Sequence, residues 1–374
     1  MTAKQIYLDY NASTPIAPEA AAAMRPFLTE HYGNPSSLHW AGIPARKAVE
    51  TARAQVARLL GSDPSEIIFT SGGTEANNHA LKGVFFARRG KGGHIITSAV
   101  EHPSILNPCH FLEKLGATVT VLPVDRFGRI DPEDVRRSIS SETILVSIMH
   151  ANNEVGTIQP LQEISAITRE AGILFHTDAA QSIGKISVNV TELGVDLLSV
   201  AGHKLHGPKG VGALYIRKGT ELVPLLHGAG HEQGRRAGTE NVLLAAGLGA
   251  ACSVTEKWTV MHGVQTLCDR FWGRLQEIFG KGVTLNGHPT QRLPNTLNVT
   301  FVGRSGSDIL KHMPSVAAST GSACHSGSAA LSPVLAAMGI APEVGAGAVR
   351  FSLGRYTTWE ELEIVLDLLN STVS

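Results

Sequence analysis

Short runs of β-branched and other apolar residues recur through the first two thirds of the chain, and polar–apolar stretches of helical length separate most of them. LQEISAITREAG (161–172) is one such stretch. Alternating strands and helices are typical of α/β folds with a mostly parallel central sheet, and this is the fold class that we predict. The runs that predict strands are EIIFT (66–70), HIITS (94–98), TVTVL (118–122), TILVSIM (143–149), ILFHT (173–177) and VDLLSV (195–200).

A helix is predicted over 45–60, because apolar residues between Val49 and Leu60 recur at three- and four-residue spacing, and Gly61 follows as a C-terminal cap. Beyond Gly247 the pattern changes, and we expect a smaller α/β domain there. Its predicted parts are a long helical stretch over 250–279, a strand within 293–302, a glycine-, serine- and alanine-rich loop over 319–330, the segment RFSL (350–353) and a terminal helix over 359–371.

At 374 residues the chain is long enough for one large and one smaller domain. We predict a large domain over 15–255 and a small domain made of 1–14 and 256–374. Lys plus Arg and Asp plus Glu both number 32, so the chain has no overall charge that would attract nucleic acid or an anionic membrane. A small molecule or another protein is the expected partner. The sequence shows neither a membrane-spanning apolar run nor a signal-peptide core, which predicts a cytoplasmic protein.

The four cysteines lie far apart, without a C-x-x-C pair or a cluster of cysteine and histidine. We therefore predict neither a disulfide framework nor a zinc site, and no metal cofactor is expected. Each cysteine is either a small core residue or a lone reactive thiol. The four are Cys109, Cys252, Cys268 and Cys324.

Polar residues follow five of the predicted strands, at the sheet edge where ligands of open α/β proteins bind. Taken alone, each cluster could be a helix cap or a turn. Five clusters at one edge predict a ligand site. They are SGGTEANN from 71, AVEHPS from 99, HANNEVG from 150, DAAQ from 178 and AGHKLHG from 201.

Three of these features match what binding of pyridoxal 5′-phosphate (PLP) requires. The glycine turn before Thr74 opens a helix whose N-terminus could hold a phosphate, although capping by Ser71 or Thr74 explains the same residues. Asp178 could keep the pyridine nitrogen protonated, and Lys204 could form an imine with the aldehyde. A surface lysine, or a structural ion pair between Asp178 and Lys204, is the alternative. The ion pair would leave His102 unexplained, a residue that could stack on the ring and pass protons or could be a core histidine.

The sequence resembles the cysteine desulfurase and selenocysteine lyase family, fold-type I PLP enzymes of the class V aminotransferase group. The resemblance runs over almost the whole chain and implies a PLP-dependent transferase fold. The segments that carry it are LDYNASTP (8–15), GNPSSLH (33–39), IFTSGGTEANN (68–78), VEH (100–102), HANNEVG (150–156), HTDAAQ (176–181), GHKLHGPKGVGALYIR (202–217), RRAGTEN (235–241), LPNTLNV (293–299), GSACHSG (321–327) and RFSLGRYTT (350–358).

The resemblance implies roles for the residues around the cofactor ring. Lys204 would form the imine with the cofactor, Asp178 would pair with the pyridinium, and His102 would lie against the ring. Gln181 and Asn153 would hydrogen-bond the phenolic oxygen, with Asn153 also near the substrate.

For the phosphate, the resemblance implies Thr74, in the glycine turn with Gly73, and His203. Thr239 would reach the phosphate of a neighbouring subunit, which implies a homodimer. Many family members carry a serine at the position of Ala201 in this chain. The selenocysteine lyases tend to lack that serine. The missing hydrogen bond to a charged acceptor, about 1.5 to 3 kcal/mol, predicts weaker cofactor binding.

For the substrate, the resemblance assigns its carboxylate to Arg350, with Arg355 as the second candidate, and a guanidinium suits a planar carboxylate. Either arginine could instead be a surface residue. Asn34 and Asn153 would add contacts. Cys324 matches the cysteine that forms a persulfide in the family.

These roles predict a cysteine desulfurase, a transferase that converts L-cysteine to L-alanine. Lys204 would remove the α-proton, the Cys324 thiolate would attack the substrate sulfur, and His102 would move protons. The persulfide would pass sulfur to an acceptor protein, as in iron–sulfur cluster assembly. Two alternatives stay open: a selenocysteine lyase acting on L-selenocysteine, which Ala201 and the CHS run at 324–326 favour, and a non-catalytic scaffold, which would not need this set of residues.

Overall fold

The computed structural model describes residues 4–90, 92–255, 260–320 and 331–373. Its largest sheet has seven strands in the order β2-β8-β7-β6-β5-β3-β4. Only β8 runs antiparallel to its neighbours in this sheet, and the other adjacent pairs are parallel, so the predicted mostly parallel sheet is confirmed. The strands are β2 (Ile67–Thr70), β3 (His94–Ser98), β4 (Thr118–Leu122), β5 (Thr143–Ser147), β6 (Leu174–Asp178), β7 (Leu197–Ala201) and β8 (Gly212–Ile216).

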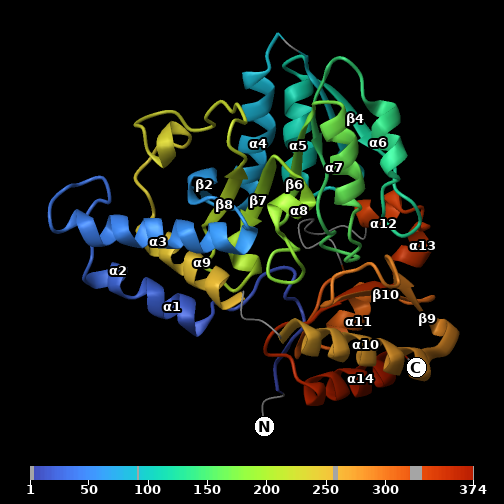
Figure 1. Cartoon of the computed structure of the whole chain (residues 1–374). Helices are drawn as coiled ribbons and strands as arrows, with labels where there is room; N and C mark the ends of the chain where they lie inside the picture. The colour runs from blue at the N-terminus through green and yellow to red at the C-terminus, as the bar shows by residue number, and fades with distance from the viewer. Residues whose placement is uncertain (1–3, 91, 256–259, 321–330, 374) are drawn as a thin grey trace.

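Helices cover both faces of this sheet (Figure 1). Successive strand residues enter different hydrophobic clusters: Ile95 packs with α4 and α5, whereas Ile96 packs in the cluster that holds α3, α7 and α9. This two-sided burial explains why the strands read as continuous apolar runs. The helices are α1 (Pro18–Met24), α2 (Pro26–Thr29), α3 (Gly42–Leu60), α4 (Gly73–Ala87), α5 (Pro103–Glu113), α6 (Pro132–Ser138), α7 (Leu161–Glu170), α8 (Val190–Leu193) and α9 (Val242–Thr255).

The C-terminal part has its own hydrophobic core, which includes Ile6 and Leu8 from the start of the chain. A three-stranded antiparallel sheet in the order β12-β10-β9 packs there with α10 and α14, and β1 pairs with β11. The elements are β1 (Ile6–Tyr7), α10 (Val260–Phe279), β9 (Val283–Asn286), β10 (Thr296–Phe301), α11 (Gly306–His312), β11 (Val316–Ala317), α12 (Pro333–Ala337), α13 (Pro342–Gly345), β12 (Ala348–Ser352) and α14 (Trp359–Val373). The domain boundaries at 14/15 and 255/256 stay a prediction, and a smaller cluster packs Val100 and Met149 with Val334 and Leu335 across them.

The segment after β1 joins the two parts of the molecule. Asp9 forms a β-bridge with Ser352 of β12, and five residues later the backbone N–H of Thr14 donates to the carbonyl of His203, 2.9 Å away. Asn11 therefore lies between the carboxyl end of β7 and the small antiparallel sheet.

Most of the predicted elements are found with shifted ends. The helix predicted over 45–60 begins three residues earlier, at Gly42, and ends at Gly61, whose φ of 67° is the left-handed conformation expected of a glycine cap. The stretch predicted over 250–279 corresponds to the end of α9 and all of α10. Residues 321–330 of the predicted loop lie outside the described residues. The sequence analysis predicts no strand at β1, β8, β9 or β11.

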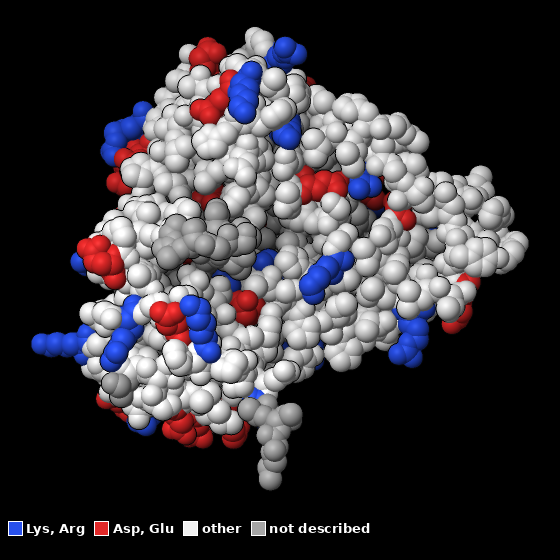
Figure 2. All heavy atoms as spheres, turned by 180° about the vertical axis from the view of Figure 1, so that it is seen from behind, with Lys and Arg blue, Asp and Glu red and all other residues white. Residues whose placement is uncertain are grey.

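Basic and acidic side chains are interspersed on the face shown in Figure 2, and a hollow opens near its centre. None of the helices within the described ranges combines the length and the apolar composition needed to cross a bilayer. Across those ranges, no group of three or more His, Cys, Asp or Glu side chains is placed to hold a metal ion.

Candidate active site

Lys204 lies at the carboxyl end of β7, in a single 3₁₀ turn that also contains Gly202. A Cβ on Gly202 would lie 2.9 Å from the carbonyl oxygen of Val211, so the turn needs glycine there. The Lys204 amine is turned inward, where its Nζ donates to the main-chain carbonyls of Asn11 (2.7 Å) and Ala12 (2.9 Å). The lysine is therefore held at the sheet edge, as the sequence predicts, and not on a solvated face.

Asp178, the last residue of β6, is buried and held by hydrogen bonds. The Asn77 Nδ2 group donates to its Oδ2 (2.7 Å), and the backbone N–H of Ala180 donates to its Oδ1 (2.9 Å). The same Asn77 amide donates to the Ser104 hydroxyl oxygen at 2.8 Å, and that oxygen lies 2.8 Å from Nδ1 of His102. A continuous polar chain thus links Asp178 to His102.

His102 caps the N-terminus of α5, where its Nδ1 accepts a hydrogen bond from the backbone N–H of Ser104 at 3.1 Å. Because Nδ1 is an acceptor, the neutral ring carries its proton on Nε2. Burial lowers the pKa of His102, and the positive charge of Lys204 lowers it further, while the negative charge of Asp178 acts in the opposite sense. All three predicted residues therefore lie close enough together to interact.

A cavity of about 370 Å³ opens at the N-terminus of α4 and is lined by residues that include Ser13, Gly72, Gly73, Thr74, His203 and Lys209. Among the described residues, no side chain caps this helix, whose N-cap residue is Gly72, with φ of 149°. A Cβ on Gly73 would lie 3.3 Å from the Cβ of Ala201, so Ala201 borders the first turn. Uncapped N–H groups, the helix dipole and the exposed Thr74 make this cavity suited to an anion.

His203 and Lys209 add to this anion cavity from the turn after β7. Burial lowers the pKa of His203 to about 4, and the charges of Lys204 and Lys209 lower it further. His203 is therefore neutral near pH 7 and contributes hydrogen bonding, while Lys209 contributes charge. The Nδ1 atom of His203 lies 3.4 Å from the hydroxyl of Ser13.

Gln181 and Asn153 both contact Asn11. Gln181 donates from Nε2 to the Asn11 carbonyl (2.9 Å) and accepts at Oε1 from the Lys185 amine (2.8 Å). The main-chain carbonyl of Asn153 accepts from the Asn11 amide (3.2 Å) and from the Arg350 guanidinium (2.9 Å). The structure thus brings the two predicted cofactor residues together around one residue that the sequence analysis gave no role.

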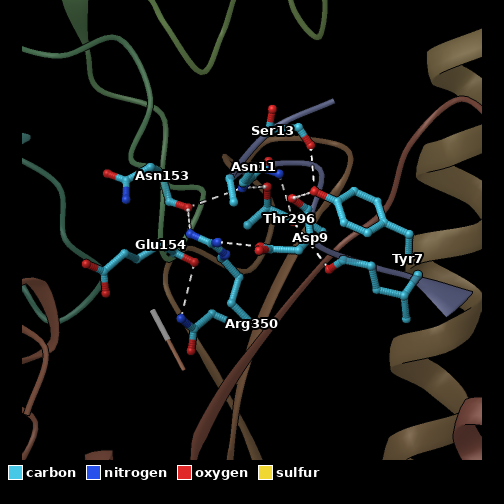
Figure 3. A network of polar contacts seen from close by, with 12 residues as sticks. Tyr7, Asp9, Asn11, Ser13, Asn153, Glu154, Thr296 and Arg350 are labelled. Atoms are coloured by element: carbon cyan, nitrogen blue, oxygen red, sulfur yellow. Dashed lines mark hydrogen bonds and ion pairs between the residues drawn. The ribbon is translucent and has the colours of Figure 1, made fainter. Parts of the chain in front are cut away.

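Arg350 points from β12 toward this group, between Asp9 and Asn153 (Figure 3). It is 3% exposed, and its Nη2 lies 2.6 Å from Oδ1 of Asp9. Its Nε is buried with no hydrogen-bond partner in the described part of the chain. The other candidate, Arg355, binds Glu19 of α1 at 3.4 Å and is 25% exposed. Arg350 is therefore the better placed of the two arginines for a carboxylate near Asn153.

Two buried glutamates border the site. Burial raises the pKa of Glu101 to about 8, although hydrogen bonds from Ser98 and Met149 act against this. Burial likewise raises the pKa of Glu154 to about 7, against a hydrogen bond from Ser332 and the charge of Arg350. Both carboxyl groups therefore hold protons at or near neutral pH and add little negative charge to the site.

Two of the predicted site residues, Asn34 and Thr239, are not brought to this group. Asn34 is exposed in the connection between α2 and α3, which projects from the side of the molecule away from β10 (Figure 1). Thr239 is exposed in the segment before α9. Cys324 lies outside the described residues. The other three cysteines, Cys109, Cys252 and Cys268, are buried core residues.

Residues of the site without a role in the sequence analysis include Asn11, Asn77, Lys185 and Lys209. Each of the four lies in or near one of the segments that carry the family resemblance. Their place in these segments is the sequence feature that could have identified them. Their partners, however, come from segments far apart in the chain; Asn11 and Lys204, for example, are 193 residues apart.

The comparisons with known proteins agree with this geometry. A model of the class-V aminotransferase family matches residues 6–365. A cysteine desulfurase IscS from Dictyoglomus turgidum is 51% identical over 374 residues, which cover 99% of this chain and 95% of that protein. The cysteine desulfurase IscS of Methanosarcina thermophila is 48% identical over 375 residues, covering 99% and 92%.

Solved structures show the same fold. A NifS-like protein superposes with a TM-score of 0.92 at 36% identity and covers 98% of each chain. A structure of SspA in complex with cysteine has a TM-score of 0.84 at 38% identity, covering 94% of this chain and all of the other. The chain therefore belongs to the class-V aminotransferase family and, within it, to the cysteine desulfurases.

Proposed function

We propose that this protein is a PLP-dependent cysteine desulfurase, which converts L-cysteine to L-alanine and leaves the sulfur as a persulfide on Cys324. One observation carries the proposal: the inward-turned amine of Lys204 lies near Asp178 and His102 in a chain 51% identical, over nearly its whole length, to a cysteine desulfurase. A scaffold protein would have no need to bury these groups together.

The residues present fit PLP at both of its charged ends. The anion cavity at α4 offers uncapped N–H groups, Thr74, His203 and Lys209 to a phosphate. At the other end, Asp178 would accept a hydrogen bond from the pyridinium nitrogen. PLP bound in this way supplies an electron sink that stabilises the carbanion formed when the α-proton leaves.

The chain's own groups would bind the substrate and move its protons. The fork of Arg350 would hold the cysteine carboxylate, using the Nε atom that has no partner in the described residues. The Lys204 amine would take the α-proton, and Nε2 of His102 is the proton-carrying atom available to pass a proton onward. Buried Asp178 and the Asn77–Ser104 bridge fix the orientation of the His102 ring.

Cys324 would bond to the substrate sulfur as the substrate's carbon–sulfur bond breaks, and the carbon skeleton would leave as alanine after taking up a proton. The buried cysteines are poor competitors for this role. Burial raises the pKa of Cys109 to about 12, so its thiol stays protonated.

A homodimer that takes Thr239 and Asn34 to the partner's site forms part of the proposal. Large apolar side chains next to Asn34 are exposed, which supports an interface there: Tyr32 is 79%, Leu38 80% and Trp40 77% exposed. A cytoplasmic location and transfer of the sulfur to an acceptor protein, for iron–sulfur cluster assembly, stay predictions.

Release of alanine from L-cysteine and L-selenocysteine, measured side by side, tests the proposal. The PLP-loaded protein should release alanine from cysteine. Lys204→Ala should abolish release from both substrates, whereas Cys324→Ala should abolish it only for cysteine, because selenium can leave without an enzyme persulfide. Turnover of selenocysteine but negligible turnover of cysteine by the unmodified protein would identify a selenocysteine lyase. No turnover of either substrate would contradict the proposal.

A further inference from the structure

A second lysine, Lys185, contacts the same residue that holds the amine of Lys204. Its Nζ donates to Oδ1 of Asn11 at 2.7 Å and to Oε1 of Gln181 at 2.8 Å. Lys185 follows Gln181 by four residues, within the turns that cover 180–185. The turn needs Gly184, which has φ of 77° and whose Cβ would lie 3.0 Å from Thr255. The local backbone thus directs the amine of Lys185 back toward Gln181.

Asn11 connects the two lysines. Its side-chain oxygen accepts from Lys185, while its main-chain oxygen accepts from Lys204 at 2.7 Å and from Gln181 at 2.9 Å. Lys185, Gln181 and Asn11 therefore form a closed ring of hydrogen bonds, and Lys204 bonds to one member of that ring. Displacement of the Lys185 amine would remove one hydrogen bond from Gln181 and one from the Asn11 side chain, which also binds Asn295 and Thr296.

The bond from Lys185 also fixes which way the Gln181 amide faces. An amine N–H can donate only to the oxygen of an amide, so Oε1 must face Lys185. The Gln181 nitrogen then faces the Asn11 carbonyl with one of its N–H groups, and the second N–H remains to donate elsewhere. A hydrogen-bond donor is what the phenolic oxygen of PLP requires from this residue.

The surroundings of Lys185 are unusual for a structural lysine. The residue lines a cavity of about 660 Å³, and its amine reaches inward to Asn11 and Gln181. Burial lowers the pKa of Lys185 well below its ordinary value, and the charges of Lys204 and Arg350 lower it further. The two bonds need two N–H groups, which an uncharged amine also has, so the ring does not depend on the protonation state.

We propose that Lys185 is a positioning residue of the active site, which orients the amide of Gln181 toward the cofactor and, through Asn11, holds Lys204 in place. The inference rests on the proposed function, because it assigns Lys185 to the site in which PLP would bind. It concerns a residue outside the set that contacts the cofactor or the substrate.

The test is the pH midpoint of the visible absorption change in the PLP-loaded protein, measured in Lys185→Met. Without Lys185, the Gln181 amide no longer donates a hydrogen bond to the phenolic oxygen of PLP. The phenolate then holds the proton of the lysine–cofactor linkage more strongly. We expect the midpoint to rise by about one pH unit, because this shift corresponds to about the free energy of one hydrogen bond.

A double-mutant cycle shows whether Lys185 acts through Gln181. In a Gln181→Leu background, Lys185→Met should shift the midpoint by no more than about half as much as it does alone. Lys185→Arg keeps N–H donor groups and can carry a positive charge, so its midpoint should stay near that of the unmodified protein. The Lys185→Arg variant also provides the test if Lys185→Met fails to fold. The exposed Lys281→Met is the matched control and should leave the midpoint unchanged.

Three outcomes would overturn the inference: an unchanged midpoint in Lys185→Met, equal shifts in both backgrounds, or equal shifts in Lys185→Met and Lys185→Arg. A purely structural lysine would lower the unfolding temperature without moving the midpoint. If the unmodified protein itself shows no PLP absorption band and releases no alanine, the proposed function fails, and this result is distinct from failure of the inference.

Discussion

The resemblance to the family predicts a serine at position 201, where this chain has Ala201. It is 3% exposed and its Cβ faces the first turn of α4, where the phosphate would bind. A serine there would place a hydroxyl against the anion. We predict that Ala201→Ser tightens PLP binding about tenfold, since a hydrogen bond to a charged acceptor contributes about 1.5 kcal/mol or more. Fluorescence titration of the cofactor-free protein measures the dissociation constant.

Pyridoxal without the phosphate is the matched control for Ala201→Ser. Its affinity should be the same in both proteins, because the new hydroxyl would face only the phosphate. Equal tightening of pyridoxal and PLP would show that the serine acts elsewhere in the site.

Arg350 and Arg355 can be separated by the same conservative substitution. Arg350→Lys keeps a positive charge but loses the fork that holds a carboxylate at two points. We predict a KM for cysteine at least tenfold higher, since such a charged hydrogen bond contributes about 1.5 to 3 kcal/mol, while kcat changes less. Steady-state alanine release gives both constants.

Arg355→Lys is the control, because Arg355 binds Glu19 and is partly exposed. The KM of Arg355→Lys for cysteine should change less than threefold, because an exposed ion pair contributes about this factor in free energy. The reverse order of effects would assign the carboxylate to Arg355.

At the scale of single residues, the sequence predicts where the site residues lie better than it predicts their hydrogen-bond partners. Lys204, Asp178 and His102 lie at strand ends and within mutual electrostatic reach, as the pattern of polar clusters indicates. The ligands of the Lys204 amine, however, are main-chain carbonyls of Asn11 and Ala12. Side-chain identity carries no information about carbonyl contacts, so no reading of residue types could have found them.

Among the elements, the segment between β8 and α9 depends on one buried ion pair. Glu232 binds Arg53 of α3 through two bonds of 2.7 and 3.0 Å and also accepts from the backbone N–H of Phe69 at 2.9 Å. Glu232 and Gln233 have φ of 48° and 60°, values that are strained for residues with a Cβ. The ion pair holds this strained turn, seven residues before Thr239, against the large domain.

We predict that Glu232→Gln destabilises the protein by about 3 to 5 kcal/mol, because it leaves the Arg53 charge buried without a partner. Glu50→Gln is a matched control, since Glu50 binds the same Arg53 but is 61% exposed at its side chain, whereas Glu232 is 2% exposed. It should cost less than about 1 kcal/mol. Urea unfolding of both variants measures the two costs, and equal costs would contradict the argument.

The elements also show where periodicity stops being informative. HIITS coincides with β3 residue for residue, and this strand is buried throughout. TVTVL coincides with β4, an edge strand of which only Leu122 is buried. β8 was missed, although it is fully buried, because its short GALYI run directly follows a glycine-rich turn. Its antiparallel direction depends on that tight turn after Lys204, and hydropathy does not report strand direction.

Across the whole molecule, Asn11 is one of the residues that join the large sheet to the small antiparallel sheet. This residue bonds to Gln181 and Lys204 on one side and to Thr296, Asn295 and Ser352 on the other. Asp9, beside it, binds Arg350. The lysine and the arginine that the proposed chemistry needs are thus positioned by one short segment. The sequence predicts both domains, but its hydrophobic pattern says nothing about how a polar segment joins them.

Buried histidines predict how the molecule as a whole responds to acid. Burial is the largest cause in each case, and it lowers the pKa of His176 to about 3 and that of four others to about 4. Those four are His79, His150, His203 and His206. The unfolded chain binds protons at these positions near the ordinary value of 6.5, whereas the folded protein does not. The stability that they contribute is complete above pH 6.5 and is lost as the pH falls toward 4.

Two carboxyl groups act in the opposite sense. The raised pKa values of Glu101 and Glu154, about 8 and about 7, mean that the folded protein keeps protons that the unfolded chain releases above its value of 4.5. This contribution grows as the pH falls from 8 to 4.5, but only two groups oppose five histidines. The net stability should therefore fall below pH 6.5.

We predict that the free energy of unfolding of the cofactor-free protein, measured in urea at half-unit steps, decreases continuously from pH 6.5 to pH 4.5. His150→Gln removes one of the five histidines and should flatten this slope, because the unfolded chain then takes up one proton fewer. The exposed His110→Gln should leave the slope unchanged. A free energy of unfolding that stays constant or rises over this interval would mean that the histidines become protonated inside the folded protein. This result would contradict the lowering of their pKa values by burial.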